Sequence, residues 1–454
     1  METPIRIATL LASIIFLVSA CGGGGGGSNG NSENGSVTAP SGAQFAPQAA
    51  AASEVEALQV PGELAWAPFD SAKSLTVPPG FGVRVWARVP NARFMALAPN
   101  GDVLVSIPSE GRIVLLRPNG DVPQTFDYAN GLRSPHDMVF HTIGDITYLY
   151  LAESNRVTRS VYQNGETASG EREVVVDGLP DSSTPNLQGG YGHQLKNIAL
   201  SSDNRLYVSI ASACNACAED TVSNPVRGAI YQYDADGSNG LLFARGLRNA
   251  EGLDFIPGTT TLWITVNNRD EVLYPFADDF DLDGQADLGK LLPAYVDDNP
   301  PELFTWVRDG ANYGWPFCNP VPNATMSNLT LVADQEVNPN GSNFDCRTAA
   351  PASKGIPAHS APLGFSFLHD SAVPEAFRRG AVVAQHGCWN CTSLSAGYRV
   401  TYFPFDDAGN AGTEIDLVTG FVTDPNARSF WGRPVDAIAD DPPQVHIHLL
   451  QGAR

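Results

Sequence analysis

One short phrase recurs along most of this chain: a turn, an apolar strand of about five residues, and then a small or polar residue. Six copies occur, and their strand centres fall near residues 104, 149, 207, 263, 382 and 445. Most copies are therefore about 45 to 63 residues apart, which is the spacing of four-stranded propeller blades. Helix signals are weak throughout. The repeat predicts an all-β fold, a six-bladed β-propeller over residues 71–454.

A second phrase supports this register, because residues 131–140 and 246–255 match position by position. The large gap between the fourth and fifth copies contains two predicted insertions, at about 273–295 and 317–356. The alternating run 81–89 precedes the first copy and is the natural strand to close the ring. The last blade then draws on both ends of the chain.

The first 20 residues have the pattern of a signal peptide. Arg6 is their only basic residue, an apolar run covers 7–18, and small residues precede Cys21. This ending resembles a lipobox, so we expect Cys21 to be lipidated; the alternative is a plain signal peptide with a chance cysteine. Residues 21–70 are rich in Gly, Ser, Ala and Pro and predict a flexible tether. Since Gly22 is not an Asp, lipoprotein sorting favours the outer membrane of a bacterial cell envelope.

Six further cysteines remain, an even number that suits an oxidising compartment. The simplest predicted pairs are Cys214–Cys217, Cys318–Cys346 and Cys388–Cys391. The alternative is a zinc site made from the two CxxC pairs. Neither CxxC is followed by His, so no c-type haem is expected.

Polar residues recur where the first strand of each predicted blade begins. They are Arg93, His136, His193, Arg248 with Asn249, His359 and Arg433. Each alone is most often a structural hydrogen-bonding residue, but together they predict a cationic pocket on the axis. Such a pocket suits a small polyanion, because Arg binds carboxylates through paired hydrogen bonds. Nucleic acid is excluded as a partner, because the net charge of the chain is −22.

An ordered set of phrases identifies a resemblance. The phrases are VPPGF (77–81), GHQ (192–194), RLYVS (205–209), GLRNAEGL (246–253), NYGWP (312–316), HSAPLG (359–364), HGCWN (386–390) and WGRPVD (431–436). Over roughly 75–440 the chain resembles quinoprotein sugar dehydrogenases of the sorbosone and soluble glucose dehydrogenase type. The resemblance implies pyrroloquinoline quinone as cofactor, with a calcium ion on the quinone.

The resemblance also implies roles for single residues. His193 matches the base, and Arg248 matches the residue that polarises the quinone carbonyl. Asn249 and Arg433 match cofactor contacts, whereas Arg93, His136 and His359 are assigned only to the pocket wall. The calcium loop of the family corresponds to Asn268, Arg269 and Asp270.

Three positions depart from the family pattern. Ser212 stands where the glucose-specific branch has an acidic partner for the base. Cys388 replaces a usual Ser and is expected to be a disulfide partner rather than a nucleophile. After residue 436 family members usually add two further strands, so the sixth blade here either lacks one strand or has an altered ending.

A second metal loop is predicted in the first insertion. Asp279, Asp281 and Asp283 precede a Gly and are followed by Asp287, in the DxDxDG pattern of calcium loops. Lys290 stands where a helix-loop-helix hand needs Glu. We expect a structural calcium loop; the alternative is a solvated acidic loop.

These observations predict a dehydrogenase that oxidises an aldose or related sugar by hydride transfer to pyrroloquinoline quinone. The electrons would pass to a separate acceptor, a cytochrome or a quinone, and the lipid on Cys21 would anchor the enzyme to the membrane. Two alternatives remain: a calcium-dependent propeller lactonase, and a non-catalytic propeller that binds surface glycans.

Overall fold

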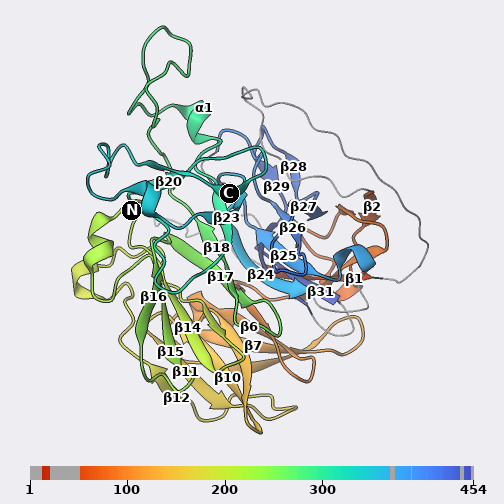
Figure 1. Cartoon of the computed structure of the whole chain (residues 1–454). Coiled ribbons are helices and arrows are strands. Elements are labelled where there is room, and N and C mark those ends of the chain that lie inside the picture. Colours follow the sequence, from red (N-terminus) through yellow and green to blue (C-terminus); the bar gives the residue numbers. More distant parts are fainter. Residues whose placement is uncertain (1–12, 21–51, 369–373, 390, 440–443, 451–454) are drawn as a thin grey trace, which may run out of the picture.

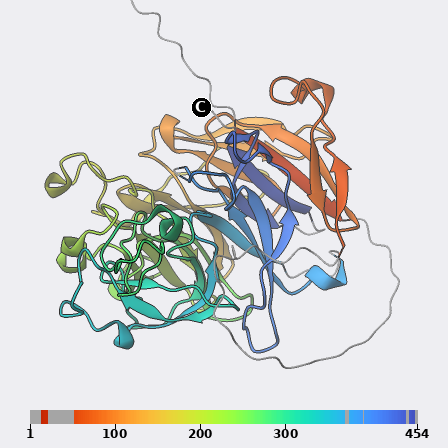
Figure 2. The same ribbon diagram turned by 90° about the horizontal axis from the view of Figure 1, so that it is seen from above.

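A computed structural model describes residues 13–20, 52–368, 374–389, 391–439 and 444–450. Within these residues the strands form six sheets of four or more strands, five with four strands and one with five. The sheets are arranged as the blades of a propeller (Figures 1 and 2). The predicted all-β propeller is confirmed. The only α-helix of the described residues is the short α1 (Pro293–Val296), and no described helix has the length and apolar character needed to cross a membrane.

Blades 1 to 3 follow the chain in order. Blade 1 contains β5 (Met95–Leu97), β6 (Val103–Ile107), β7 (Arg112–Arg117) and β8 (Gln124–Ala129). Blade 2 contains β9 (Met138–Ile143), β10 (Ile146–Glu153), β11 (Arg156–Val161) and β12 (Glu173–Val176). Blade 3 contains β13 (Ile198–Leu200), β14 (Arg205–Ile210), β15 (Ala229–Asp234) and β16 (Leu241–Arg245).

Blades 4 to 6 are less regular. Blade 4 contains β17 (Asn249–Phe255), β18 (Leu262–Asn267), β19 (Glu302–Trp306), β23 (Ala352–Ile356) and β21 (Ser327–Leu329). Blade 5 contains β24 (Pro362–Leu368), β25 (Gly380–Gln385), β26 (Arg399–Pro404) and β27 (Ile415–Val418). Blade 6 contains β30 (Arg433–Ala439), β31 (Gln444–Leu450), β1 (Ser13–Ala20) and β4 (Phe81–Arg88).

Three two-stranded ribbons complete the described structure. They are β2 (Glu54–Ala57) with β3 (Ser74–Val77), β20 (Cys318–Pro320) with β22 (Leu331–Ala333), and β28 (Val422–Asp424) with β29 (Ser429–Phe430).

The core lies between the faces of neighbouring blades. Leu104 and Leu115 of blade 1 share one buried cluster with Leu149 and Leu151 of blade 2. Inner strands are covered on both faces, so they read as continuous apolar runs; all five residues of β6 are buried. This is why the repeated phrase is apolar throughout rather than alternating.

Buried aspartates connect neighbouring blades near the axis. The carboxylate of Asp436 in blade 6 accepts two hydrogen bonds. One comes from the N–H of the next residue, Ala437, at 2.9 Å, and the other from the N–H of Met95 in blade 1 at 2.8 Å. Asp137 joins blade 2 to blade 3 and Asp254 joins blade 4 to blade 5 in the same way. The Asp436 bond joins the last blade to the first and so closes the ring.

The last blade differs from the sequence prediction. The run 81–89 was expected to close the ring, and β4 does form the outer edge of blade 6. However, β1 lies between β31 and β4, so the blade has four strands rather than three. Strands near the two ends of the chain therefore lie side by side (Figure 2). β1 falls within the predicted signal peptide 1–20, so the expectation that this whole segment lies outside the propeller was wrong. The export role of the segment stays a prediction. The lipidation of Cys21, which lies outside the described residues, also stays a prediction.

The predicted tether 21–70 is too long at its C-terminal end. Leu58, Leu64 and Phe69 are buried in the core cluster of blades 5 and 6, and β2 pairs with β3. The composition of this segment, rich in Ala and Pro, gave no sign that these three apolar residues would be buried. Nothing is described for residues 21–51.

The two predicted insertions have different structures. Residues 273–295 lie outside the blades and project beyond the sheets with α1 (Figure 1). Residues 317–356, in contrast, supply β21 and β23 to blade 4, so this segment is partly an extension of the blade. All three predicted disulfides are present, Cys214–Cys217, Cys318–Cys346 and Cys388–Cys391, which leaves no thiolates for the alternative zinc site.

Candidate active site

A pocket of about 140 Å³ lies where blades 3, 4 and 5 meet. First strands begin and second strands end at this edge, because consecutive strands of a blade are antiparallel. The lining residues are His193, Arg248, Asn249, Asn267, Asn268, Asp270, Glu302, His359, Ala361, Gly387, Cys388 and Trp389. Six residues predicted from the sequence, His193, Arg248, Asn249, Asn268, Asp270 and His359, thus share one cavity.

His193 precedes β13 and is held through one ring nitrogen. Its Nδ1 lies 3.0 Å from the carbonyl oxygen of Ser212 and 3.1 Å from the Ser212 hydroxyl. A carbonyl oxygen can only accept, so Nδ1 carries the proton and Nε2 keeps a lone pair. Desolvation in the pocket, and then the charge of Arg248, lower the pKa of His193 to about 4. The ring is therefore a neutral base at neutral pH.

Arg248 lies directly before β17 and is buried. Its guanidinium donates to the carbonyls of Asn268 at 2.6 Å and Asn215 at 3.3 Å, and it approaches the Asp270 carboxylate at 3.4 Å. Burial lowers the pKa of Arg248, but a guanidinium stays charged at any pH of interest. A fixed cation therefore faces the same pocket as the His193 base.

Asp270 connects Arg248 to His359. The Asp270 carboxylate lies 3.6 Å from Nδ1 of His359, whose Nε2 lies 2.6 Å from the carbonyl oxygen of Val296. Burial lowers the pKa of His359, but the bonds to Asp270 and Val296 outweigh it, and the net pKa is raised. With both nitrogens facing acceptors, the charged imidazolium is the form that satisfies them.

Glu302 is a second buried carboxylate in the pocket. It begins β19, accepts the N–H of Asn268, and burial raises its pKa to about 7. Glu302 was not predicted from the sequence, because no motif contains it. Trp389 was also missed; it belongs to the HGCWN phrase, and its side chain is 69% exposed at the rim.

Arg93, His136 and Arg433, the other predicted ring residues, are not among the described residues that line this cavity. Arg93 lies 3.9 Å from Glu251, which accepts from Asn249 at 2.9 Å. Arg433 donates to the backbone carbonyls of His386 and Gly387 and so supports the wall formed by Gly387 and Cys388.

His136 does not belong to the pocket wall. It is fully buried, contacts the carbonyl of Lys196 at 3.3 Å, and lies against the ring of Phe94 with the centroids 4.2 Å apart. Burial, followed by the charge of Arg93, lowers its pKa well below the ordinary value. The predicted wall role is corrected to that of a neutral core histidine.

Residues 75–424 match the family model described as TrAA12-like. The chain belongs to the TrAA12-like family. Its fold is similar to the pyranose dehydrogenase PQQ domain from Coprinopsis cinerea, with a TM-score of 0.65 and 18% identity over 83% of this chain and 97% of that one. It is also similar to a calcium structure of a Trichoderma reesei Carbohydrate-Active Enzymes Family AA12 protein, with a TM-score of 0.64 and 17% identity over 90% and 98%. The resemblance to quinoprotein sugar dehydrogenases is thus confirmed at the level of family and fold.

One curated relative is 25% identical over 239 residues, an uncharacterized protein of Borreliella burgdorferi. The match covers 52% of this TrAA12-like chain and 52% of that protein, so it spans about half the length of each.

Two of the three residues predicted to hold the cofactor calcium, Asn268 and Asp270, bring oxygens to this TrAA12-like pocket, and Asn267 adds a third. The carbonyls of Asn267 and Asn268 and the carboxylate of Asp270 lie around Arg248, and such hard oxygens suit a divalent cation. The side chain of Arg269 forms ion pairs with Asp334 at 2.6 Å and Glu336 at 2.7 Å. A calcium contact of Arg269 would therefore use its backbone carbonyl, and this contact stays a prediction.

The lining fits an anionic quinone only together with such a cation. Arg248 and protonated His359 would attract carboxylates, whereas Asp270 and the ionised form of Glu302 would repel them. A cation bound between the carboxylates of the ligand and those of the pocket would remove that repulsion. The donor set is therefore compatible with a carboxylated quinone and calcium bound as a unit.

The second predicted metal loop brings three carboxylates together. Asp279, Asp281 and Asp283 place ligand oxygens within 4.8 Å of one another. Asp287 takes a different role, because its carboxylate accepts from Phe280 and pairs with Lys290 at 2.7 Å. The arrangement fits a cation held by three of the four predicted residues, and its calcium stays a prediction.

Proposed function

We propose that this chain is a sugar dehydrogenase that uses pyrroloquinoline quinone and calcium. It would oxidise the hydroxyl or hemiacetal carbon of an aldose or a related sugar. The proposal is supported by membership of the TrAA12-like family and by the named similarity to a pyranose dehydrogenase PQQ domain. When bound, the quinone supplies the acceptor for a hydride from the sugar carbon.

The observation that carries the proposal is the pairing of His193 with Arg248 in one pocket. The Ser212 carbonyl fixes the proton of His193 on Nδ1 and leaves Nε2 free to take the hydroxyl proton of the sugar. Arg248 provides a fixed positive charge in the same cavity, where negative charge develops during oxidation. Ser212 thus replaces the acidic partner found in the glucose-specific branch.

The partners follow from this chemistry as proposals. No haem attachment sequence follows either CxxC, so the electrons would leave through a separate cytochrome or quinone. We also propose that the enzyme is a lipoprotein of the cell envelope, attached through Cys21. Cleavage before Cys21 would remove β1 from blade 6, so the full chain and a chain that begins at Cys21 have to be tested separately.

The test is reconstitution of the full chain. The protein is incubated with pyrroloquinoline quinone and calcium, and the quinone spectrum is followed while aldoses are added. His193→Ala should take up the quinone but lose about 10²- to 10⁴-fold in its rate of reduction, the usual contribution of a general base. His141→Ala is the matched control, because His141 contacts Asn204 far from the pocket. A folded wild-type chain that takes up no quinone would sink the proposal.

A further inference from the structure

Residues 212–215 contact three groups of the candidate active site. Ser212 accepts from Nδ1 of His193, and its own N–H donates to the carbonyl of Arg248 at 2.7 Å. The carbonyl of Asn215 accepts from Nε of Arg248 at 3.3 Å. The third group is Asp270, which binds the side chain of Asn215.

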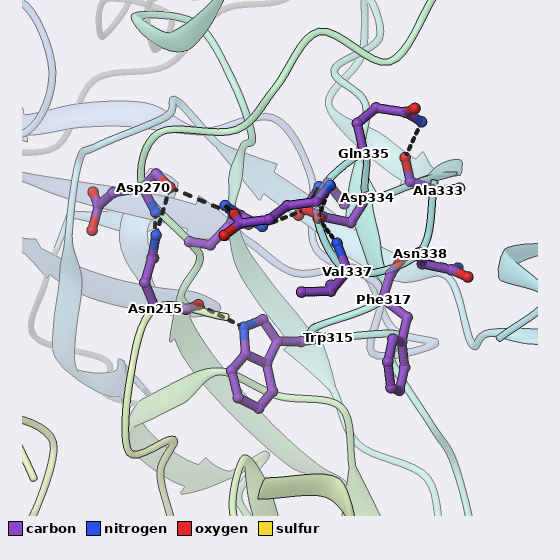
Figure 3. A network of polar contacts seen from close by, with 12 residues as sticks. Asn215, Asp270, Trp315, Phe317, Ala333, Asp334, Gln335, Val337 and Asn338 are labelled. Atoms are coloured by element: carbon purple, nitrogen blue, oxygen red, sulfur yellow. Dashed lines mark hydrogen bonds and ion pairs between the residues drawn. The ribbon is translucent and has the colours of Figure 1, made fainter. Parts of the chain in front are cut away.

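The amide of Asn215 pairs with both backbone groups of Asp270. Its Nδ2 donates to the Asp270 carbonyl at 2.8 Å, and its Oδ1 accepts the Asp270 N–H at 2.8 Å. Figure 3 shows Asn215 paired with Asp270. This pairing fixes the peptide that carries the carboxylate between Arg248 and His359. The indole of Trp315 donates to the carbonyl of Asn215 at 3.1 Å and so holds Asn215 in place.

The same loop is fixed on its other side by Arg269. Its guanidinium forms ion pairs with buried Asp334 and with Glu336 of the second insertion. Asp334 in turn accepts the backbone N–H groups of Glu336 and Val337 at 2.9 and 3.0 Å. Asp270 therefore lies between two anchored segments, and Asn215 is the anchor on the side of Arg248.

A disulfide closes the turn that presents Asn215. Cys214 and Cys217 are bonded on either side of it. The preceding N–H of Ala213 donates to Asp220 at 2.6 Å, and Asp220 is paired with buried Arg227 at 2.5 Å. The turn is thus held at both ends, as a positioning element must be.

We propose that Asn215 is a positioning residue of the active site, which sets Asp270 and, through its carbonyl, Arg248. Its meaning for turnover rests on the proposed function, whereas its effect on the loop does not. Because Asn215 lies outside the described lining of the pocket, a change there acts through its partners rather than by contact with a ligand.

The test compares Asn215→Ala and Asn215→Asp with the full wild-type chain. Hydrogen exchange of the Asp270 amide is measured without ligand, and turnover is measured after reconstitution with quinone and calcium. Asn215→Ala should speed exchange of the Asp270 amide about tenfold, because this N–H loses the side-chain oxygen of Asn215 as its acceptor. Asn215→Asp keeps that acceptor but loses the donor to the Asp270 carbonyl, so its exchange should lie between those of the wild type and Asn215→Ala. A double variant, Cys214→Ser with Cys217→Ser, should give intermediate exchange.

In turnover, Asn215→Ala should lower kcat about five- to tenfold and leave the sugar KM within about twofold, since it misplaces charged groups rather than sugar contacts. Asn323→Ala is the control: Asn323 makes a similar two-way contact, to Ser327 and Thr325, away from the pocket. Unchanged Asp270 exchange in Asn215→Ala, or exchange that rises equally in every blade, would overturn the inference. If the variants show the expected exchange but the reconstituted wild type oxidises no sugar, only the proposed function would be overturned.

Discussion

The imidazole of His193 should stay neutral far into the acid range. Desolvation, followed by the charge of Arg248, lowers its pKa from 6.5 to about 4. The shift corresponds to about 3 kcal/mol in favour of the neutral ring. At pH 5 about 90% of His193 should then be neutral, against about 3% of an ordinary histidine. The base would therefore be available well below the pH at which histidines normally protonate.

The assay is an NMR titration of the cofactor-free full chain with labelled histidine. The chain has eight histidines, and the signal of His193 is assigned by its loss in His193→Gln. Arg248→Gln removes the second cause of the shift but keeps most of the desolvation. Its midpoint should therefore rise above that of the wild type and stay below 6.5. Arg248→Lys keeps the charge and should titrate close to the wild type.

Two results would refute this reasoning separately. A wild-type midpoint at or above about 6 would show that the ring is not desolvated in the pocket, and the neutral base would lose its support. A midpoint that does not change in Arg248→Gln would show that the guanidinium and the imidazole are not coupled. Circular dichroism of each variant at both ends of the titration checks that the fold persists.

Three further outcomes concern stability. Millimolar calcium should raise the melting temperature of the wild type more than that of Asp281→Asn, which keeps the oxygens of the active-site pocket. Saturation of the 279–283 loop at 100 times its Kd would contribute about 2.7 kcal/mol, and an equal gain in the variant would exclude this loop. Cys318→Ser with Cys346→Ser should lose about 3 kcal/mol in denaturant titration, because the bond closes a loop with a sequence separation of 28; a loss below about 1 kcal/mol would contradict this. Arg269→Met should cost about 3–5 kcal/mol, because Asp334 is left buried without its cation, and an unchanged midpoint would show that the pair is dispensable.

The propeller could be predicted because its signal is periodic. Each blade repeats the same apolar strand, and neighbouring blades cover both faces of that strand, so burial leaves a regular trace in the sequence. The three disulfides could be predicted because the simplest pairing joins cysteines that are close along the chain. Periodicity gives no such trace for β1 or for Leu58, Leu64 and Phe69, which fill places in the last blades from outside the repeat.

The candidate site was predicted unevenly for a geometric reason. One polar residue at the start of each blade suggested a ring of six, but the cavity lies over blades 3, 4 and 5 rather than evenly around the axis. His193, Arg248 and His359 belong to those blades. Arg93 and Arg433 belong to blades 1 and 6, and His136 to blade 2, where it is buried among core residues. Topological equivalence therefore does not ensure a shared cavity.

The charge of the pocket also differs from the prediction, and the difference matters for its chemistry. The polar residues at the starts of the first strands suggested a cationic pocket, and the family resemblance placed one acidic residue, Asp270, beside it. Glu302 begins the third strand of blade 4, and Asp270 follows the second, so the structure places Asp270 in the pocket and adds Glu302, which was not predicted. Each cation consequently has an anionic neighbour, which fixes its position but reduces its attraction for a polyanion. A cation bound together with an anionic ligand would offset the charge of these carboxylates.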